Sequence, residues 1–83
     1  MKYRAIIVED EPLSADRLHG MLSKQQNLQI EAVLNSVSET KNWLSENNIP
    51  DLLFLDIQLG DGTGLDILNE LTSFPQVIFT TAF

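Results

Sequence analysis

Acidic side chains stand at the end of two apolar runs in this sequence. The run from Tyr3 to Val8 leads directly into Glu9 and Asp10, and the run LLFL at 52–55 leads into Asp56. If both runs are neighbouring parallel strands, the three carboxylates meet at one sheet edge and repel each other unless a cation lies between them. Hard oxygen ligands favour Mg2+ or Mn2+, so the pattern predicts a divalent-metal site.

A simpler interpretation of Asp56 also has to be weighed. A single aspartate after a strand is more often a turn former or a helix cap than a reactive group. The joint pattern is more specific, because an acid pair follows one strand, an aspartate ends another, and the hydroxyl residues Thr80 and Thr81 end a further apolar run. A strand-end carboxylate beside a metal can also act as a nucleophile toward a phosphoryl group.

Strands and helices alternate along the chain. The expected strands cover 3–8, 28–35, 51–56 and 77–81, and the expected helices cover 12–24, a segment capped by Ser36, and a segment capped by Thr63 or Asp61 that extends to Leu71. Ser36 and Glu39 fit a capping box. A β-α-β-α-β-α-β order predicts right-handed crossovers and an α/β fold with a parallel sheet covered on both faces.

The composition excludes several function classes. The chain has 83 residues, 43 per cent hydrophobic and 20 per cent charged, no cysteine and a net charge of −7. This length allows one domain at most, and the missing cysteines exclude disulfides and thiolate metal sites. The negative charge argues against binding of a nucleic-acid backbone by this segment. No apolar run is long enough to span a bilayer, so we expect no membrane partner and a cytoplasmic location.

The sequence ends at Ala82-Phe83, just after the fourth expected strand. Three helices for four strands leave one sheet face partly bare, and we expect poor cover over Ile6, Val8 or their neighbours. Strand 77–81 would then be an edge with unpaired backbone groups. We therefore expect a domain that is cut short, with a possible homodimer through the fourth strand or the bare sheet face.

Three stretches together carry a family resemblance. VEDEP at 8–12, LLFLDIQLGDGTGLDIL at 52–68 and VIFTTAF at 77–83 resemble the receiver domain of two-component response regulators. The match is similar to the LytTR-type branch, in which the receiver precedes a DNA-binding domain. The resemblance implies a flavodoxin-like doubly wound sheet of order 2-1-3-4. Residues 1–83 would be an incomplete receiver domain that lacks the fifth strand and the last two helices.

The resemblance also implies a role for each matching position. Asp56 would be the phosphoacceptor, Asp10 the direct metal ligand, Glu9 a second acid that reaches the metal through water, Gln58 a ligand through its backbone carbonyl, Thr81 the switch hydroxyl, and Gly64 the glycine that closes the loop. The cofactor would be Mg2+ or Mn2+ and the phosphodonor a sensor histidine kinase. DNA would be contacted only through an output domain outside this chain.

Two departures from the family pattern stand out. Gly60 occupies a position where many relatives carry proline, and the family lysine at the end of a fifth strand has no counterpart in this sequence. The expected protein is therefore not an enzyme but a phosphoacceptor that assists its own phosphoryl transfer.

Two other functions remain open on the sequence. A haloacid-dehalogenase-like Mg2+-dependent phosphatase also uses a strand-end aspartate, but it needs a second aspartate two residues later, where this chain has Gln58. A receiver-like interaction module that is never phosphorylated is the other alternative. His19 has no ligand partner at helical spacing and is expected at the surface, and Trp43 is expected to pack on the sheet.

Overall fold

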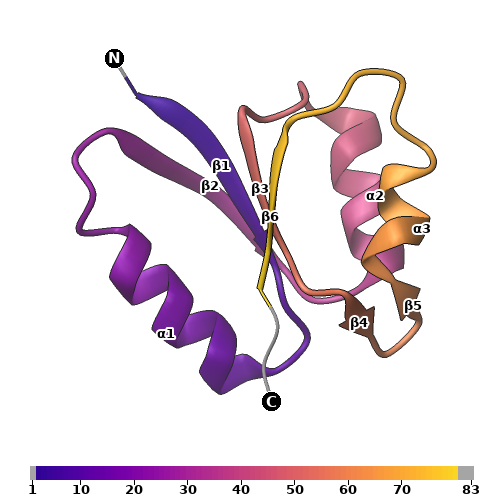
Figure 1. The fold of residues 1–83 in the computed structure, drawn as a ribbon, viewed down its shortest axis with the longest axis horizontal. Coiled ribbons are helices and arrows are strands. Elements are labelled where there is room, and N and C mark those ends of the chain that lie inside the picture. Colours follow the sequence, from indigo (N-terminus) through magenta and orange to yellow (C-terminus); the bar gives the residue numbers. More distant parts are fainter. Residues whose placement is uncertain (1, 81–83) are drawn as a thin grey trace.

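A parallel four-stranded sheet organises the computed structural model, which describes residues 2–80 (Figure 1). The elements in chain order are β1 (Tyr3–Val8), α1 (Pro12–Leu22), β2 (Leu28–Leu34), α2 (Val37–Glu46), β3 (Leu52–Leu55), β4 (Gln58–Leu59), β5 (Gly62–Thr63), α3 (Gly64–Leu68) and β6 (Gln76–Phe79). The main sheet has the order β2-β1-β3-β6. Because β4 and β5 form a separate sheet, β6 is the fourth strand of the main sheet along the chain. The predicted order 2-1-3-4 is therefore confirmed.

The helices lie on both faces of this sheet. In Figure 1, α1 is on one side of the strands, and α2 and α3 are on the other. All three strand pairs are parallel, so the carboxyl ends of β1, β3 and β6 lie at the same sheet edge. A parallel sheet needs crossovers that place helices on its faces, which is the reason for this three-layer arrangement.

The face toward α2 and α3 carries the larger core. It includes Ile6 and Val8 of β1 together with Leu53 and Leu55 of β3, all with no exposed surface. The expectation that Ile6 and Val8 would be poorly covered is therefore wrong. Side chains alternate along a strand, and these two residues point to the face that two helices cover.

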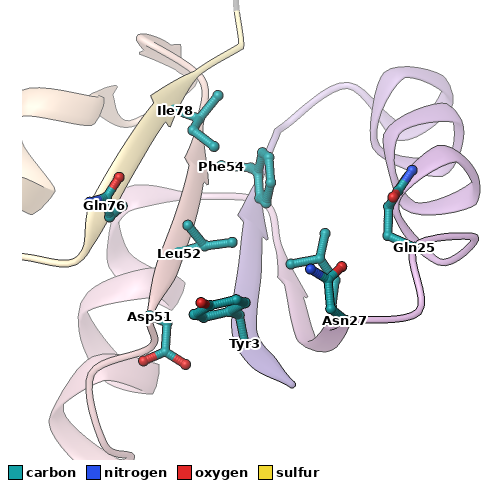
Figure 2. A pocket seen from close by; sticks show the side chains of 9 residues that line it. Tyr3, Gln25, Asn27, Asp51, Leu52, Phe54, Gln76 and Ile78 are labelled. Atoms are coloured by element: carbon teal, nitrogen blue, oxygen red, sulfur yellow. The ribbon is translucent and has the colours of Figure 1, made fainter. Parts of the chain in front are cut away.

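The incompletely covered face is the one beside α1. Ala5, Ile7 and Phe54 are buried there with help from Leu18 and Leu22 of the helix. A groove of about 720 Å3 opens over the sheet toward the end at which the strands begin. Figure 2 shows the groove side chains, which come from all four strands of the main sheet, from the turn after α1 and from the residue before β3: Tyr3, Gln25, Asn27, Leu28, Asp51, Leu52, Phe54, Gln76 and Ile78.

Several boundaries differ from the sequence prediction around Asp56 and beyond. A short antiparallel hairpin, β4–β5, stands between β3 and α3, where only a loop was expected. The strand β3 covers only Leu52–Leu55 and not 51–56. The helix α3 ends at Leu68 and does not reach Leu71, and β6 begins at Gln76 and ends at Phe79. A strand of two residues is too short to show an alternating pattern of apolar and polar residues. The sequence of this hairpin therefore cannot be distinguished from that of a loop.

Cap residues explain where the helices α2 and α3 begin. The Ser36 hydroxyl accepts the N–H of Glu39 at 3.0 Å, as predicted, but the Glu39 carboxylate accepts from Asn35 at 3.2 Å and not from Ser36 itself. Thr63 is the N-cap residue of α3, and its N–H donates to Asp66 at 2.9 Å. Asp61, the other candidate cap for α3, instead accepts the N–H of Val37 at the start of α2, at 2.8 Å.

Candidate metal centre

Three carboxylates meet at the carboxyl edge of the main sheet. Glu9 and Asp10 follow β1, and Asp56 follows β3, the neighbour of β1 in the sheet. One carboxylate oxygen from each of these residues lies within 4.8 Å of the others. The structure therefore brings together the three acids that the sequence pattern placed at one sheet edge.

Backbone hydrogen bonds fix the two inner acids. The N–H of Asp56 donates to the carbonyl of Val8 at 3.0 Å, and the N–H of Glu9 donates to the carbonyl of Leu34 at 2.9 Å. These bonds extend the parallel ladders by one residue beyond β3 and β1. Glu9 and Asp56 are only 5 and 9 per cent exposed, whereas Asp10 is open to solvent. Two rigid, shielded carboxylates and one accessible carboxylate thus form the centre.

The charge on Glu9 is unfavourable in this arrangement. Burial raises the pKa of Glu9 above its ordinary value, and the neighbouring Asp56 and Asp10 carboxylates raise it further. The N–H of Glu11, which donates to Glu9 Oε2 at 3.0 Å, acts in the opposite direction on this pKa but is outweighed. A cation between the three carboxylates would remove the repulsion that causes part of this shift.

The donor set fits a hard divalent cation. Three carboxylate oxygens on a rigid edge, with one side open to water, match the preference of Mg2+ for few protein ligands and several waters. The backbone of Gln58 lies next to this cluster, because its N–H donates to Asp56 Oδ1 at 3.2 Å. The arrangement can therefore hold a cation and leave coordination positions for oxygens of an incoming anion.

Close packing at Gly64 places the segment after Asp56. A Cβ at Gly64 would lie 2.8 Å from the carbonyl oxygen of Asp56 and 2.9 Å from Cγ of Leu55. The N–H of Gly64 donates to the carbonyl of Ile57 at 2.7 Å. Only a residue without a side chain allows α3 to begin this close to the end of β3, which gives the loop glycine a physical reason.

The hydroxyl side of the site is described in part. The switch hydroxyl predicted at Thr81 lies outside the described residues. Thr80, the last described residue, donates its N–H to the carbonyl of Leu55 at 2.9 Å, so the chain after β6 runs beside the end of β3. The Thr80 hydroxyl is buried and has no hydrogen-bond partner among residues 2–80.

Two cationic side chains, Arg4 and Lys41, form ion pairs away from Asp56. Arg4 forms an ion pair with Glu31 at 2.7 Å and donates to the carbonyls of Asn48 and Ile49, at the opposite end of β1. Lys41 pairs with Glu70 at 3.1 Å between α2 and α3. Neither replaces the family lysine near Asp56.

The remaining candidates take the structural roles expected of them. His19 is exposed on α1, and Trp43 packs against the core between α2 and the sheet.

No helix among residues 2–80 combines the length and the apolar character needed to cross a membrane. Asp61, which was predicted only as a cap residue for α3, connects the segment after Asp56 to α2.

Comparisons with known proteins agree with this geometry. The response regulator receiver domain family matches residues 5–83. The sensory transduction protein LytR of Staphylococcus saprophyticus is 40 per cent identical over 82 residues, which are 95 per cent of this chain and 32 per cent of that protein. This similarity confirms the predicted resemblance to the LytTR-type branch. The chain thus spans about a third of the length of this curated relative.

Solved structures show the same fold. The response regulator PhyR from Brucella abortus superimposes with a TM-score of 0.85 at 31 per cent identity, over 100 per cent of this chain and 35 per cent of PhyR. The MaeR response regulator bound to beryllium trifluoride gives a TM-score of 0.85 at 30 per cent identity, over 100 per cent of this chain and 69 per cent of that one. With its flavodoxin-like sheet and its acidic centre, this chain belongs to the response regulator receiver domain family.

Proposed function

We propose that Asp56 accepts a phosphoryl group from a sensor histidine kinase, with Mg2+ or Mn2+ held by Glu9, Asp10, Asp56 and the backbone carbonyl of Gln58. The observation that carries the proposal is the meeting of three carboxylates within 4.8 Å, with Asp56 fixed at the end of a buried central strand. A receiver domain is a signalling switch and not a classical enzyme. The phosphatase alternative therefore falls away.

The residues of the site would promote phosphoryl transfer mainly by holding the reacting groups in place. An Asp56 carboxylate oxygen forms the new bond to phosphorus while the phosphorus–nitrogen bond to the donor histidine breaks, and the leaving imidazole takes up a proton. Hydrogen bonds from the backbone hold Asp56 in place, so little reorganisation precedes attack. A bound divalent cation would offset the charge of the phosphoryl oxygens. Glu9 and Asp10 would help to hold that cation beside Asp56.

The switch step is assigned to Thr81. Its hydroxyl would bond the phosphoryl group on Asp56 and so bias the surface between two states. The backbone bond from Thr80 to Leu55 supports this proposal, because it brings the chain before Thr81 to the end of β3. We further propose that residues 1–83 act as a receiver unit that regulates a DNA-binding output domain in the cytoplasm.

Phosphorylation with a small phosphodonor tests the proposal. Wild-type protein with Mg2+ and acetyl phosphate should gain one acid-labile phosphoryl group on Asp56, located by mass spectrometry after borohydride reduction. Asp56→Asn should abolish the label, and Asp16→Asn, at an exposed aspartate on α1, should keep it. Beryllium trifluoride, which MaeR binds, offers a stable phosphoryl mimic for the same comparison.

The outcome also decides the remaining alternative. Phosphate found on serine, threonine or histidine would contradict the assignment of Asp56. A wild-type protein that binds Mg2+ but gains no label from acetyl phosphate or from a histidine-phosphorylated donor would instead favour an interaction module that is never phosphorylated.

A further inference from the structure

Asp61 makes an unusual connection between two distant parts of the chain. It stands with Gly60 in the two-residue turn between β4 and β5. Its Oδ1 accepts the N–H of Val37 at 2.8 Å, and its Oδ2 accepts the N–H of Ser38 at 3.0 Å. These are the first two amides of α2, so one carboxylate ties the turn after Asp56 to the start of another helix.

This connection is not needed merely to cap α2. Ser36 already serves as the N-cap residue, and its hydroxyl accepts the N–H of Glu39 at 3.0 Å. Asp61 satisfies the two remaining free amides of the first turn, in the position where the helix dipole favours negative charge. These two amides lower the pKa of Asp61, so the contact is made by an ionised carboxylate at neutral pH.

The same turn also lies against the acidic centre. A Cβ at Gly60 would be 3.8 Å from Asp10 Oδ2, so the turn passes directly beside this carboxylate. The N–H of Gln58 donates to Asp56 Oδ1 at 3.2 Å. Between these points Leu59 is buried in the core that also includes Val37. The hairpin is thus held at α2 on one side and faces the metal ligands on the other.

We propose that Asp61 is a positioning residue for the metal centre. By fixing the hairpin tip to α2, it holds the Gln58 backbone beside Asp56 and the Gly60 backbone beside Asp10. Asp61 itself touches neither the cation nor the phosphoryl group. The inference rests on the proposed function, since it assigns a support to the site that binds the divalent cation. Outer partners of this kind commonly change metal affinity by about 10–100-fold when they are removed.

The test compares two caps of the same helix. Mg2+ affinity is measured by isothermal titration calorimetry, in the full-length protein, for wild type, Asp61→Asn and Ser36→Ala. Both substitutions remove a cap interaction of α2, but only Asp61 connects α2 to the hairpin. We expect Asp61→Asn to raise the Mg2+ Kd about tenfold and Ser36→Ala to leave it unchanged, with thermal melting recorded for each. Asp10→Asn serves as the reference for loss of a direct ligand.

A second measurement needs no variant. Energetic coupling between two sites is reciprocal, so Mg2+ binding should tighten the Asp61 contact by the same factor by which that contact tightens Mg2+ binding. Amide hydrogen exchange of Val37 and Ser38 in wild type should therefore slow about tenfold at saturating Mg2+. Exchange that does not respond to Mg2+ would overturn the inference.

The outcomes separate the inference from the function beneath it. If Asp10→Asn weakens Mg2+ binding while Asp61→Asn does not, or if Ser36→Ala weakens it equally, the positioning role is wrong and the metal site stands. A wild-type protein that binds no Mg2+ would overturn both the positioning role and the proposed function.

Discussion

Asp10 is the only one of the three acids that is open to solvent, which makes it the accessible ligand of the cluster. We predict that Asp10→Asn weakens Mg2+ binding by more than the about tenfold expected for loss of an outer partner, because an amide replaces one of the few charged ligands of the site. The exposed position should leave the fold intact. A calorimetric Mg2+ titration checks this, and equal affinity in wild type and variant would show that the cation binds elsewhere.

Glu9 makes the stability of the metal-free protein depend on pH. Since its pKa is raised in the folded state, the stability that protonated Glu9 contributes is fully present below the unfolded pKa, about 4.3, and is lost as pH rises through the higher folded pKa. We predict that Glu9→Gln, in EDTA, melts at a higher temperature than wild type at pH 7, and that this gain disappears toward pH 4. Thermal melting across this range measures it.

Bound Mg2+ should stabilise wild type more than Glu9→Gln. A cation that binds the folded state raises the melting temperature according to its affinity, and wild type keeps the carboxylate that Glu9→Gln lacks. Saturating Mg2+ is therefore expected to stabilise wild type more than the variant at pH 7. A variant that is less stable than wild type in EDTA at pH 7 would contradict the unfavourable burial of the Glu9 charge.

At the scale of elements, the start of α3 depends on the absence of a side chain at Gly64. Gly64→Ala would place a methyl group 2.8 Å from the Asp56 carbonyl oxygen, so α3 or the end of β3 must shift. We predict a loss of about 1–3 kcal/mol in the free energy of unfolding, as for overpacked cores, together with slower phosphorylation of Asp56. Urea denaturation and the acetyl phosphate reaction measure the two effects.

Gly20 provides the matched control. It lies within α1, and a Cβ there would meet no atom within 4 Å. Gly20→Ala should therefore stabilise the protein by about 0.5–1 kcal/mol, through helix propensity alone, and leave phosphorylation unchanged. If both alanine variants shifted stability in the same direction, close packing at Gly64 would not be the reason for its glycine.

At the scale of the whole molecule, the two edges of the described sheet differ. The edge strand β2 carries a register irregularity beside Ala5 and Ile6, and the charged pair Arg4–Glu31 lies along it. Bulges and charges are common protections against edge pairing. The strand β6, QVIF, has neither, and Ile78 and Phe79 are 43 and 46 per cent exposed. We propose that two copies of the 83-residue chain associate through β6 or through the groove beside it.

Sedimentation of the 83-residue chain tests this association. We predict concentration-dependent dimerisation at micromolar concentration, and we expect Ile78→Lys to raise the dimer Kd at least about tenfold, because a charge at the edge opposes pairing. Val33→Lys is the control, since Val33 on β2 is equally exposed at 43 per cent. A cooperatively folding monomer, or an equal effect of both substitutions, would refute the assignment to β6.

The alternation of strands and helices, the parallel sheet and the position of Glu9, Asp10 and Asp56 at strand ends could all be predicted from the sequence. These features depend on local patterns: short apolar runs, cap residues and strand ends that a parallel sheet must gather at one edge. The strand order was predicted from the family resemblance and not from these patterns, and the described order β2-β1-β3-β6 confirms it. The same patterns predicted the structural roles of His19, which is exposed, and of Trp43, which packs against the core.

The open face of the sheet and the contacts of Asp61 could not be predicted from the sequence. Ile6 and Val8 could not be assigned to a covered face from alternation alone, because alternation does not say which crossover lies on which side. Asp61 bonds amides that lie 24 and 23 residues earlier in the chain, and no local spacing encodes such a contact. A carboxylate finds its partner through the packing of the whole domain, so its role became visible only when β3, the hairpin and α2 were placed together in space.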